Sequence, residues 1–392
     1  MLPSHSSRRR RAGLTTLLLA VLASYDPALA GDGMPPADPP SRPVATPPLP
    51  PVVVVSGSPG EIGKQLGAAE ADNMRAMLRL AWLRSIPVRL LHGRRLEGFI
   101  QAIPSAYREE IAACARSAGI DESTLLAANV LVDSQCSALV SPARAGEPLR
   151  VARNLDFFPA SVVGPRTVVR VVRADGKHAV ASLGWPGFAG VTSGMNDSGL
   201  TACVLLNRNH LMRSGMPICF CIRDLLENCT TLDQAVERFS RCCVASSHYL
   251  LLADAQGAAV VWWDEHGMHR DDPTDGWLAA SNGQRRHGLP VDSRGQRLVA
   301  LGDHLRTLPV DDAAMRQSLT ASYLDTLNAQ AMVFIPAQLQ LQFALGTAFH
   351  PAACGYWRAI DLGALLAGEP AASAAITDLG CSVSLPHPLT LR

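Results

Sequence analysis

Three residues near the middle of the sequence have types that support nucleophilic chemistry. Cys136 begins a stretch with strand character, and Arg153 and Asp156 lie on the next such stretch. An arginine beside a thiol favours the thiolate, which is the nucleophilic form, and an aspartate can hold an amine or orient the arginine. We expect a hairpin to bring all three to one sheet end, with Asn154 turned away and the strand bent so that Asp156 joins Arg153. The residue types alone also fit a buried cysteine beside a structural Arg–Asp pair.

Other motifs with chemically active residue types are weaker candidates. Residues 264–272 (DEHGMHRDD) contain metal-ligating types, but His266 followed by glycine between two strand-like runs is typical of a hairpin tip. The stretch GVTSG at 190–194 misses the spacing of a serine nucleophile elbow by one position, and no helix follows it. The pair Trp262 and Trp263 fits a sheet better than a ligand site. We therefore expect no metal and no cofactor.

The elements that would position these residues alternate between helical and strand patterns. After a β-branched run from Val52, helical patterns are expected at 61–84, 96–117 and 122–131. Three hairpins are expected next, at 136–140 with 149–154, 167–173 with 178–183, and 191–193 with 200–206. Helices at 218–228 and 232–239, strands at 248–254 and 258–263, and one further helix complete the order. Segregated helices and hairpins favour an α+β fold with antiparallel sheet over a doubly wound fold.

Six segments in the right order resemble the cysteine N-terminal-nucleophile (Ntn) hydrolases. CSALVSPARAGEPLRVARNLDF is similar to the start of their catalytic subunit, above all in the acyl-coenzyme A:6-aminopenicillanate (isopenicillin N) acyltransferase group, which is related to choloylglycine hydrolase, penicillin V acylase and acid ceramidase. The others are SGSPGEIGKQLG, PSAYREEIAACARSAGIDESTLLAANVL, GWPGFAGVTSGMNDSGL, LLLADAQGAAVVWW and WLAASNGQ. The resemblance covers roughly residues 52–365. It implies a four-layer αββα sandwich of two antiparallel sheets.

The resemblance also assigns roles to particular residues. It implies that cleavage of the Gln135–Cys136 bond releases Cys136 as a new N-terminus whose α-amine, with a reference pKa of about 7.7–8.0, acts as general base. Arg153 and Asp156 match the pair that orients the amine and the thiol. Asn282 matches the residue that donates to the oxyanion, and Asn207 is a weaker match for an oxyanion donor. Arg294 matches an arginine that serves as a charge partner of the site. Two positions depart from the family pattern, because Ser137 stands for the usual Thr and Ala138 for Ser or a similar small residue.

The implied reaction is the hydrolysis of a linear amide. Cys136 attacks the carbonyl of a small-molecule N-acyl substrate, and a thioester acyl-enzyme forms and then transfers the acyl group to water. Two alternatives stay open: an acyltransferase that passes the acyl group to an amine, and an exported binding protein that kept the fold without activity. The implied partners are the substrate and the two chains, α and β, of one precursor.

The N-terminus has the pattern of an export signal. Arg8–Arg11 form a basic region, Ala12–Ala23 form an apolar run shorter than a membrane span, and Ala28-Leu29-Ala30 gives a small-residue cleavage site. We therefore expect a signal peptide at 1–30, a Pro-rich linker at 31–51, a helical pro-segment or α chain at 52–135 and a catalytic β chain at 136–392. A general secretory and a twin-arginine signal both fit, and an uncleaved anchor is the alternative. The protein is expected to be periplasmic or secreted.

The charge balance and the hydropathy of the sequence limit the kinds of partner that we expect for the protein. Over 392 residues, 35 Lys and Arg balance 34 Asp and Glu, so no electrostatic footprint for nucleic acid stands out. No segment after the signal is long and apolar enough for a stable membrane span. Buried thiols with one or two disulfides are expected among the ten cysteines, at positions 114, 136, 203, 219, 221, 229, 242, 243, 354 and 381.

Overall fold

The structure of the chain is a computed structural model. It describes residues 47–381 apart from 131–134, 145, 158, 207–213, 284, 287–288, 291–292, 306–309, 325–326 and 349. The helices are α2 Pro59–Gln101, α3 Ser105–Ala118, α4 Glu122–Val130, α5 Ala160–Val163, α6 Ile218–Asn228, α7 Leu232–Ser240, α8 Ser293–Leu305, α9 Asp312–Ser318 and α10 Gly363–Ala367. Short 3₁₀ turns lie at η1 Gly164–Arg166, η2 Leu319–Ala321, η4 Pro336–Gln338, η5 Ala352–Cys354 and η6 Ala371–Ser373.

The first sheet has eight strands in the order β1-β4-β5-β6-β7-β8-β9-β10. The strands are β1 Val52–Gly57, β4 Val168–Ala174, β5 Val180–Gly184, β6 Ser193–Asn196, β7 Thr201–Leu205, β8 Tyr249–Ala253, β9 Ala258–Asp264 and β10 Gly267–Asp271. Consecutive strands from β4 onward pair antiparallel, whereas β1 pairs parallel with β4. Gly199, in the turn between β6 and β7, has a φ of +82°, and a Cβ there would lie 2.6 Å from the carbonyl oxygen of Pro336. The turn therefore requires glycine.

The second sheet has seven strands in the order β11-β2-β3-β14-β15-β16-β17, all paired antiparallel. The strands are β2 Gln135–Ser141, β3 Arg150–Asp156, β11 Leu278–Ser281, β14 Asn328–Ile335, β15 Gln340–Leu345, β16 Tyr356–Asp361 and β17 Ile376–Cys381. The short strands β12 Arg285–Arg286 and β13 Leu289–Pro290 form a separate ribbon. The hairpin β2–β3 therefore lies inside the sheet, between the edge strand β11 and β14.

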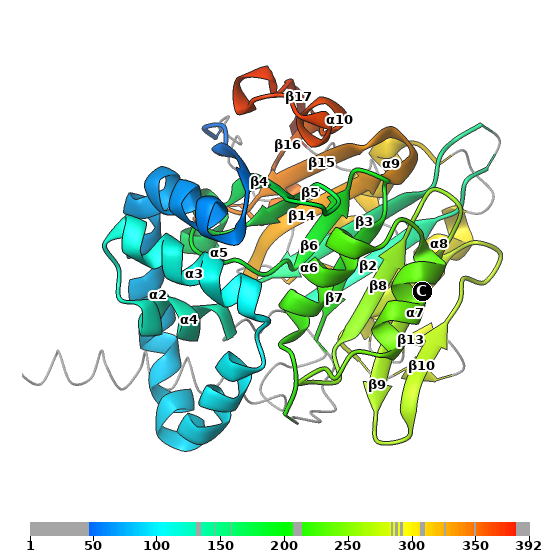
Figure 1. Cartoon of the computed structure of the whole chain (residues 1–392). Coiled ribbons are helices and arrows are strands. Elements are labelled where there is room, and N and C mark those ends of the chain that lie inside the picture. The colour runs from blue at the N-terminus through cyan, green and yellow to red at the C-terminus, as the bar shows by residue number, and fades with distance from the viewer. Residues whose placement is uncertain are drawn as a thin grey trace, which may run out of the picture.

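The sheets stack face to face with helices outside them (Figure 1). Alternate side chains of β2 belong to two different apolar cores. Cys136, Ala138 and Val140 belong to the core between the sheets, whereas Leu139 packs with Leu298 of α8 under the outer helices. Helices α6 and α7 contact β5–β9 of the first sheet, and α8 and α9 contact β2, β3, β11 and β14 of the second. Together with the antiparallel pairing, this confirms the α+β sandwich of two sheets predicted from the sequence.

The N-terminal helices form a block of their own beside the first sheet. Helices α2, α3 and α4 contact one another, and α2 also contacts β1 and β4. Ser58 caps α2 with a capping box to Glu61, which fixes where this helix begins. Residues of α2 and α3 share an apolar core with Val172 of β4 and Phe220 of α6. The segment before Gln135 is thus packed against the segment after it.

Several element predictions hold, and two are corrected. The predicted hairpins coincide with β2–β3, β4–β5 and β6–β7, and the predicted helix at 218–228 is α6. Two helices are predicted at 61–84 and 96–117, but the break between the observed helices lies at a different place. Helix α2 continues to Gln101, and α3 begins after Pro104, its N-cap residue. After β10 the chain forms two substantial helices, α8 and α9, and four long strands, β14–β17, rather than one helix. β14 is buried along its whole length and so lacks the alternation that marks a half-buried strand.

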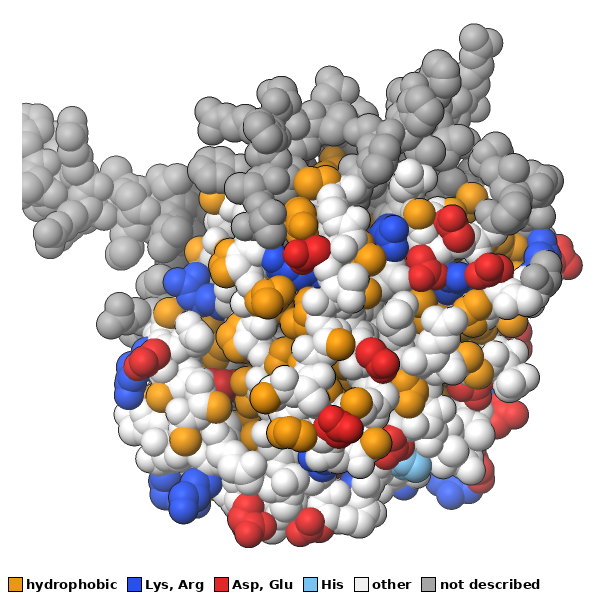
Figure 2. All heavy atoms as spheres, turned by 90° about the horizontal axis from the view of Figure 1, so that it is seen from above, with side chains coloured by type: hydrophobic (Ala, Val, Ile, Leu, Met, Phe, Trp, Pro, Cys, Tyr) orange, Lys and Arg blue, Asp and Glu red, His pale blue; other side chains and the backbone are white. Residues whose placement is uncertain are grey.

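One face of the molecule carries charges of both signs. Figure 2 shows acidic and basic side chains interspersed with apolar ones on the face seen there. Among the described residues, no helix has the length and apolarity needed to cross a membrane.

Candidate active site

Cys136 lies at the start of β2 with its side chain in the core between the sheets. The residue is fully buried, and its strand position is opposite Leu155 of β3. The Gln135–Cys136 bond lies at the very beginning of the strand, and Gln135 is opposite Asp156. The ladder with β3 therefore holds Cys136 in place on one side, and the pairing with β11 begins at the next residue, Ser137.

Arg153 reaches the Cys136 thiol from the neighbouring strand. Arg153 is opposite Ala138, two residues from Cys136 on the same face, and this diagonal spacing is within reach of a long side chain. Its Nη2 lies 3.0 Å from Cys136 Sγ and also donates to the carbonyl of Val204 at 2.7 Å, while Nη1 donates to the carbonyl of Thr192 at 3.0 Å. Backbone carbonyls at the first sheet thereby hold a buried guanidinium against the thiol.

Asn282 contacts Cys136 from the other side. It follows β11, which pairs with β2 so that Ser281 is opposite Ser137. The backbone N–H of Cys136 donates to Oδ1 of Asn282 at 2.9 Å. The buried Nδ2 of the same amide has no hydrogen-bond partner among the described residues. One amide thus accepts from the nitrogen of Cys136 and keeps a buried donor unused.

Asp156 lies at the end of β3, on the side that carries Asn154 rather than on the side of Arg153. The side-chain Nδ2 of Asn328 donates to Oδ1 of Asp156 at 2.9 Å and to Oδ1 of Asn154 at 3.2 Å. The backbone N–H of Leu324 also donates to Oδ1 of Asp156, at 3.4 Å. The predicted bend that joins Asp156 to Arg153 is therefore corrected: strand alternation holds, and the carboxylate lies across from Gln135 at the bond predicted to be cut.

Two predicted site residues are not placed at Cys136. Asn207 lies outside the described residues. Arg294 lies in the first turn of α8, a helix that contacts β2 and β11, and only its backbone position is described. The hairpin β2–β3 and the strand β11 therefore bring together Cys136, Arg153 and Asn282, with Asp156 at the adjoining strand end.

Sequence reasoning missed several buried polar groups around this site. Asn328, which holds Asp156, lies at the start of a strand that was not predicted. Ser193 is fully buried, its Oγ has no hydrogen-bond partner among the described residues, and it directly follows the Thr192 carbonyl that Arg153 contacts. Cys203 is opposite Ser193, and burial raises the pKa of its thiol to about 11 although Arg153 opposes this. Cys203 therefore remains a neutral thiol, unsuited to attack.

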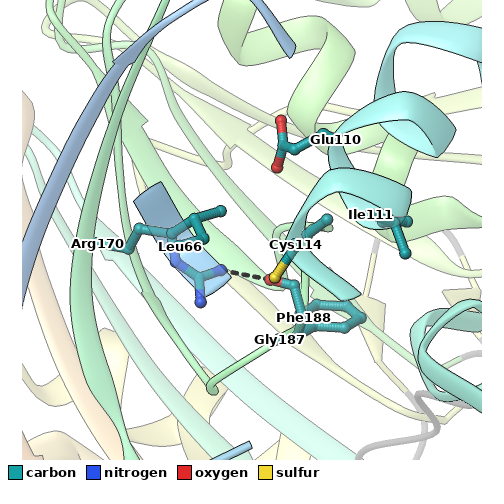
Figure 3. Close-up of a pocket in the computed structure, with 8 residues that line it drawn as sticks. Leu66, Glu110, Ile111, Cys114, Arg170, Gly187 and Phe188 are labelled. Atoms are coloured by element: carbon teal, nitrogen blue, oxygen red, sulfur yellow. Dashed lines mark hydrogen bonds between the residues drawn. The ribbon is translucent and has the colours of Figure 1, made fainter. Parts of the chain in front are cut away.

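A small cavity lies elsewhere, between the N-terminal helices and the first sheet (Figure 3). Its lining includes Leu66, Cys114, Arg170 and Phe188, and the guanidinium of Arg170 donates to the carbonyl of Phe188. Burial raises the pKa of the Cys114 thiol to about 12, so this thiol is not a nucleophile. The cavity contains none of the predicted site residues and has room for on the order of one water molecule.

Residues 264–272, whose side-chain types could bind a metal, form the hairpin predicted from the sequence. Strands β9 and β10 are joined around Gly267, which has a φ of +126°, and Nε2 of His269 lies 2.8 Å from a carboxylate oxygen of Asp264. Among the described residues, no group of three or more metal-ligating side chains is assembled.

The two-sheet sandwich places a cysteine at the start of an inner strand, between an arginine and an asparagine. Residues 144–273 match the family model described as "Acyl-coenzyme A:6-aminopenicillanic acid acyl-transferase". This match confirms the family resemblance found in the sequence. It includes Arg153 and Asp156 and begins after Cys136. No curated protein matches the chain.

Solved structures are similar to this chain at low identity. An N-acylethanolamine-hydrolyzing acid amidase ortholog from Caenorhabditis elegans has 19% identity and a TM-score of 0.43, covering 51% of this chain and 93% of its own. A conjugated bile acid hydrolase from Clostridium perfringens has 13% identity and a TM-score of 0.44, with 62% and 96% covered. Penicillin V acylase from Agrobacterium tumefaciens has 16% identity and a TM-score of 0.34, with 64% and 100% covered.

Proposed function

We propose that the chain is a precursor that cuts itself at Gln135–Cys136 and then cleaves a linear amide bond of an N-acyl substrate. The observation that carries the proposal is the double contact of Cys136: its Sγ lies 3.0 Å from Arg153 Nη2, and its backbone nitrogen lies 2.9 Å from Asn282 Oδ1. Both the thiol and the future amine of one residue are thus held before any cut has been made.

The maturation step uses the thiol of Cys136 against its own peptide bond. Sγ attacks the carbonyl carbon of Gln135, the C–N bond breaks, and the nitrogen of Cys136 takes the thiol proton. Water then hydrolyses the resulting thioester, which leaves a carboxylate on Gln135 and a free α-amine on Cys136. Asp156, opposite Gln135 in the strand register, lies beside the bond that breaks.

The mature enzyme would use the same atoms on a substrate. The α-amine of Cys136 accepts the thiol proton, and Sγ attacks the amide carbonyl to form a tetrahedral intermediate. The unpaired Nδ2 of Asn282 is the donor available for the oxygen that becomes negative. The leaving amine takes the proton back, and water, deprotonated by the α-amine, releases the acid from the thioester.

An acyltransferase is the second candidate, and the description of the matched family favours it. The two activities share the thioester and differ only in what attacks it. Incubation of the cleaved protein with an N-acyl donor and a primary amine distinguishes them by product: free acid alone for a hydrolase, and a new amide for an acyltransferase.

The proposal is tested by the intact mass of the purified protein. We expect two chains whose boundary is Gln135–Cys136, with export shown by an N-terminus at Gly31. The variant Cys136→Ala should give a single chain. Two chains that persist in Cys136→Ala would show that another protease makes the cut, which would overturn self-cleavage. A correctly cleaved protein that turns over no amide in a broad panel would favour the non-catalytic alternative.

A further inference from the structure

The loop between β5 and β6, residues 185–192, is held in place by side chains from other elements. All its residues are buried, so its backbone polar groups need partners inside the protein. Arg170 of β4 donates to the carbonyl of Phe188 (Figure 3), and Arg223 of α6 donates to the carbonyl of Ala189 at 2.8 Å. The position of this loop therefore depends on the elements packed around it.

Two residues of the N-terminal helices hold the middle of the same loop. Asn129 of α4, which is 2% exposed, donates through Nδ2 to the carbonyl of Gly187 at 2.9 Å, and its Oδ1 accepts from the N–H of Ala189 at 2.7 Å. Glu70 of α2 accepts from the N–H of Gly187 at 2.9 Å. Gly187 has a φ of +76°, and a Cβ there would lie 3.0 Å from the side chain of Met74 of α2. The loop is thus packed directly against the N-terminal helices.

The far end of this loop contributes to the candidate active site. The carbonyl of Thr192 accepts from Nη1 of Arg153 at 3.0 Å, and Nη2 of the same guanidinium lies 3.0 Å from Cys136 Sγ. Two residues separate Ala189 from Thr192. Thr192 is therefore within about 10 Å of chain from the point that Asn129 holds. A displacement of the loop at that point shifts the carbonyl that fixes Arg153.

We propose that Asn129 is a positioning residue of the active site, which acts through the loop on Arg153 and Cys136. The inference rests on the proposed function, because it concerns how the proposed nucleophile is held. Asn129 lies six residues before Gln135 and so belongs to the α chain of the cleaved protein, whereas the loop and Arg153 belong to the β chain. The α chain thus completes a site whose reacting atoms all lie in the β chain.

The test is Asn129→Ala, which removes both contacts to the loop and changes no residue at the thiol. Two quantities are measured: kcat and KM on a linear N-acyl amide, and hydrogen exchange of the Val204 amide, whose N–H donates to the same Thr192 carbonyl at 3.0 Å. We expect faster exchange at Val204, because its acceptor is less firmly held. We also expect kcat to fall by about 10- to 100-fold with KM within a few-fold, because small misplacements at a reacting centre have effects of this size.

Tyr107→Phe is the matched control, because it also removes a buried hydrogen bond between the N-terminal helices and the later chain. The hydroxyl of Tyr107 donates to Glu227 at 2.8 Å, a residue of α6 rather than of the loop. This variant should leave both the exchange at Val204 and kcat close to those of the parent. Asn129→Asp keeps the acceptor for the Ala189 N–H and loses the donor. It is the second variant if Asn129→Ala does not fold, and it should change both quantities in the same direction.

Two results would overturn the proposal. One is an Asn129→Ala protein in which Val204 exchanges as slowly as in the parent, and the other is faster exchange with an unchanged kcat. A wild-type protein that turns over no amide would remove the proposed function instead. The exchange at Val204 would then decide alone whether Asn129 fixes the Thr192 carbonyl, so the two failures are distinguishable.

Discussion

At the residue scale, the side chain of Asn282 is central because its two ends have different environments. Oδ1 accepts from the Cys136 N–H at 2.9 Å, whereas the buried Nδ2 has no partner among the described residues. A buried donor left unpaired is costly, by about 1–3 kcal/mol, unless something satisfies it during function. The developing oxyanion supplies such a partner, because it exists only during the reaction.

Asn282→Ala should therefore lower kcat by about 10²–10³ and leave KM within a few-fold. Asn282→Asp keeps an acceptor for the Cys136 nitrogen and loses the donor, so it should be at least as harmful to kcat. Steady-state kinetics on a linear N-acyl amide, such as a penicillin V or N-acyl amino acid analogue, measures both variants. A kcat for Asn282→Ala within about threefold of the parent would remove the oxyanion role.

Asn328 is the second residue for which the effect of a substitution on activity can be predicted. Its Nδ2 donates to Asp156, and its Oδ1 accepts from the Ala353 N–H at 2.7 Å. Asn328→Asp would replace the donor by a second carboxylate, and like charges raise the pKa of Asp156. Asp156 would then become protonated at a higher pH, so a second acidic limb of the kcat/KM profile, below the limb set by the α-amine of Cys136, should move to higher pH.

Asn328→Ala removes the same hydrogen bond without adding charge and is the control for that shift. We expect it to lower the rate while this second limb stays closer to that of the parent. Thermal unfolding checks that both variants are folded. If the folded Asn328→Asp variant has the same pH profile as the parent, Asp156 does not act in its ionised form.

At the element scale, two buried ion pairs join the N-terminal helices to the part of the chain that follows Cys136. Glu70 of α2 pairs with Arg170 of β4 at 2.7 Å, and both side chains are at most 4% exposed. Glu110 of α3 pairs with Arg223 of α6 at 2.6 Å, and these side chains are at most 3% exposed. Glu70 also accepts from the backbone N–H of Gly187 at 2.9 Å. Glu70 neutralises an arginine that would otherwise be a lone buried charge, and Glu110 shares Arg223 with the buried Glu227.

Glu70→Gln should therefore destabilise the protein strongly, by about 3–5 kcal/mol, because it leaves Arg170 buried and unpaired. The matched control is Glu237→Gln, which removes a pair with Arg241 whose side chains are 65% and 74% exposed. Loss of that exposed pair should cost about 0–1 kcal/mol. Urea unfolding measures both in the Cys136→Ala background, where a single chain is expected. Equal effects of the two variants would contradict this account of the interface.

At the scale of the whole molecule, local patterns in the sequence indicate part of the fold. The turn signals between short apolar stretches predicted the hairpin β2–β3, and that hairpin is what brings Arg153 to Cys136. The helix at Ile218–Asn228 was predicted with the observed bounds, because one of its faces is apolar and a proline precedes it. These features depend on residues close together in the chain.

The remaining features depend on contacts between distant residues, which local patterns do not encode. Asn282 reaches Cys136 across 146 residues, and only the family resemblance suggested it. The interior strand β14 is buried throughout, so no alternation marks it, and Asn328 at its start could not be linked to Asp156. The side of β3 on which Asp156 lies follows from strict strand alternation, whereas a bend was expected. The pairing of Glu70 with Arg170 likewise depends on how α2 packs against β4.

The interface between the N-terminal helices and the rest of the chain leads to a prediction for the cleaved molecule. After a cut at Gln135–Cys136, no peptide bond would join residues 31–135 to residues 136–392, and the buried pairs and the shared apolar core would hold them together. Charge pairs inside the protein are screened by salt much less than exposed pairs are. We therefore expect both chains to elute as one complex in gel filtration at low salt and at 1 M salt, where the Debye length is about 3 Å.

The measurement compares native gel filtration with a denaturing gel of the same fractions. Both chains should be present in every fraction of one native peak, and they should separate only in denaturant. Glu110→Gln, introduced into protein that still cleaves itself, should lower the urea concentration at which the chains separate, because Arg223 would keep only Glu227 as a buried partner. Glu237→Gln, on the exposed face of α7, should leave that concentration unchanged. Chains that separate in 1 M salt without denaturant would show that exposed charges, and not the buried core, hold the mature molecule together.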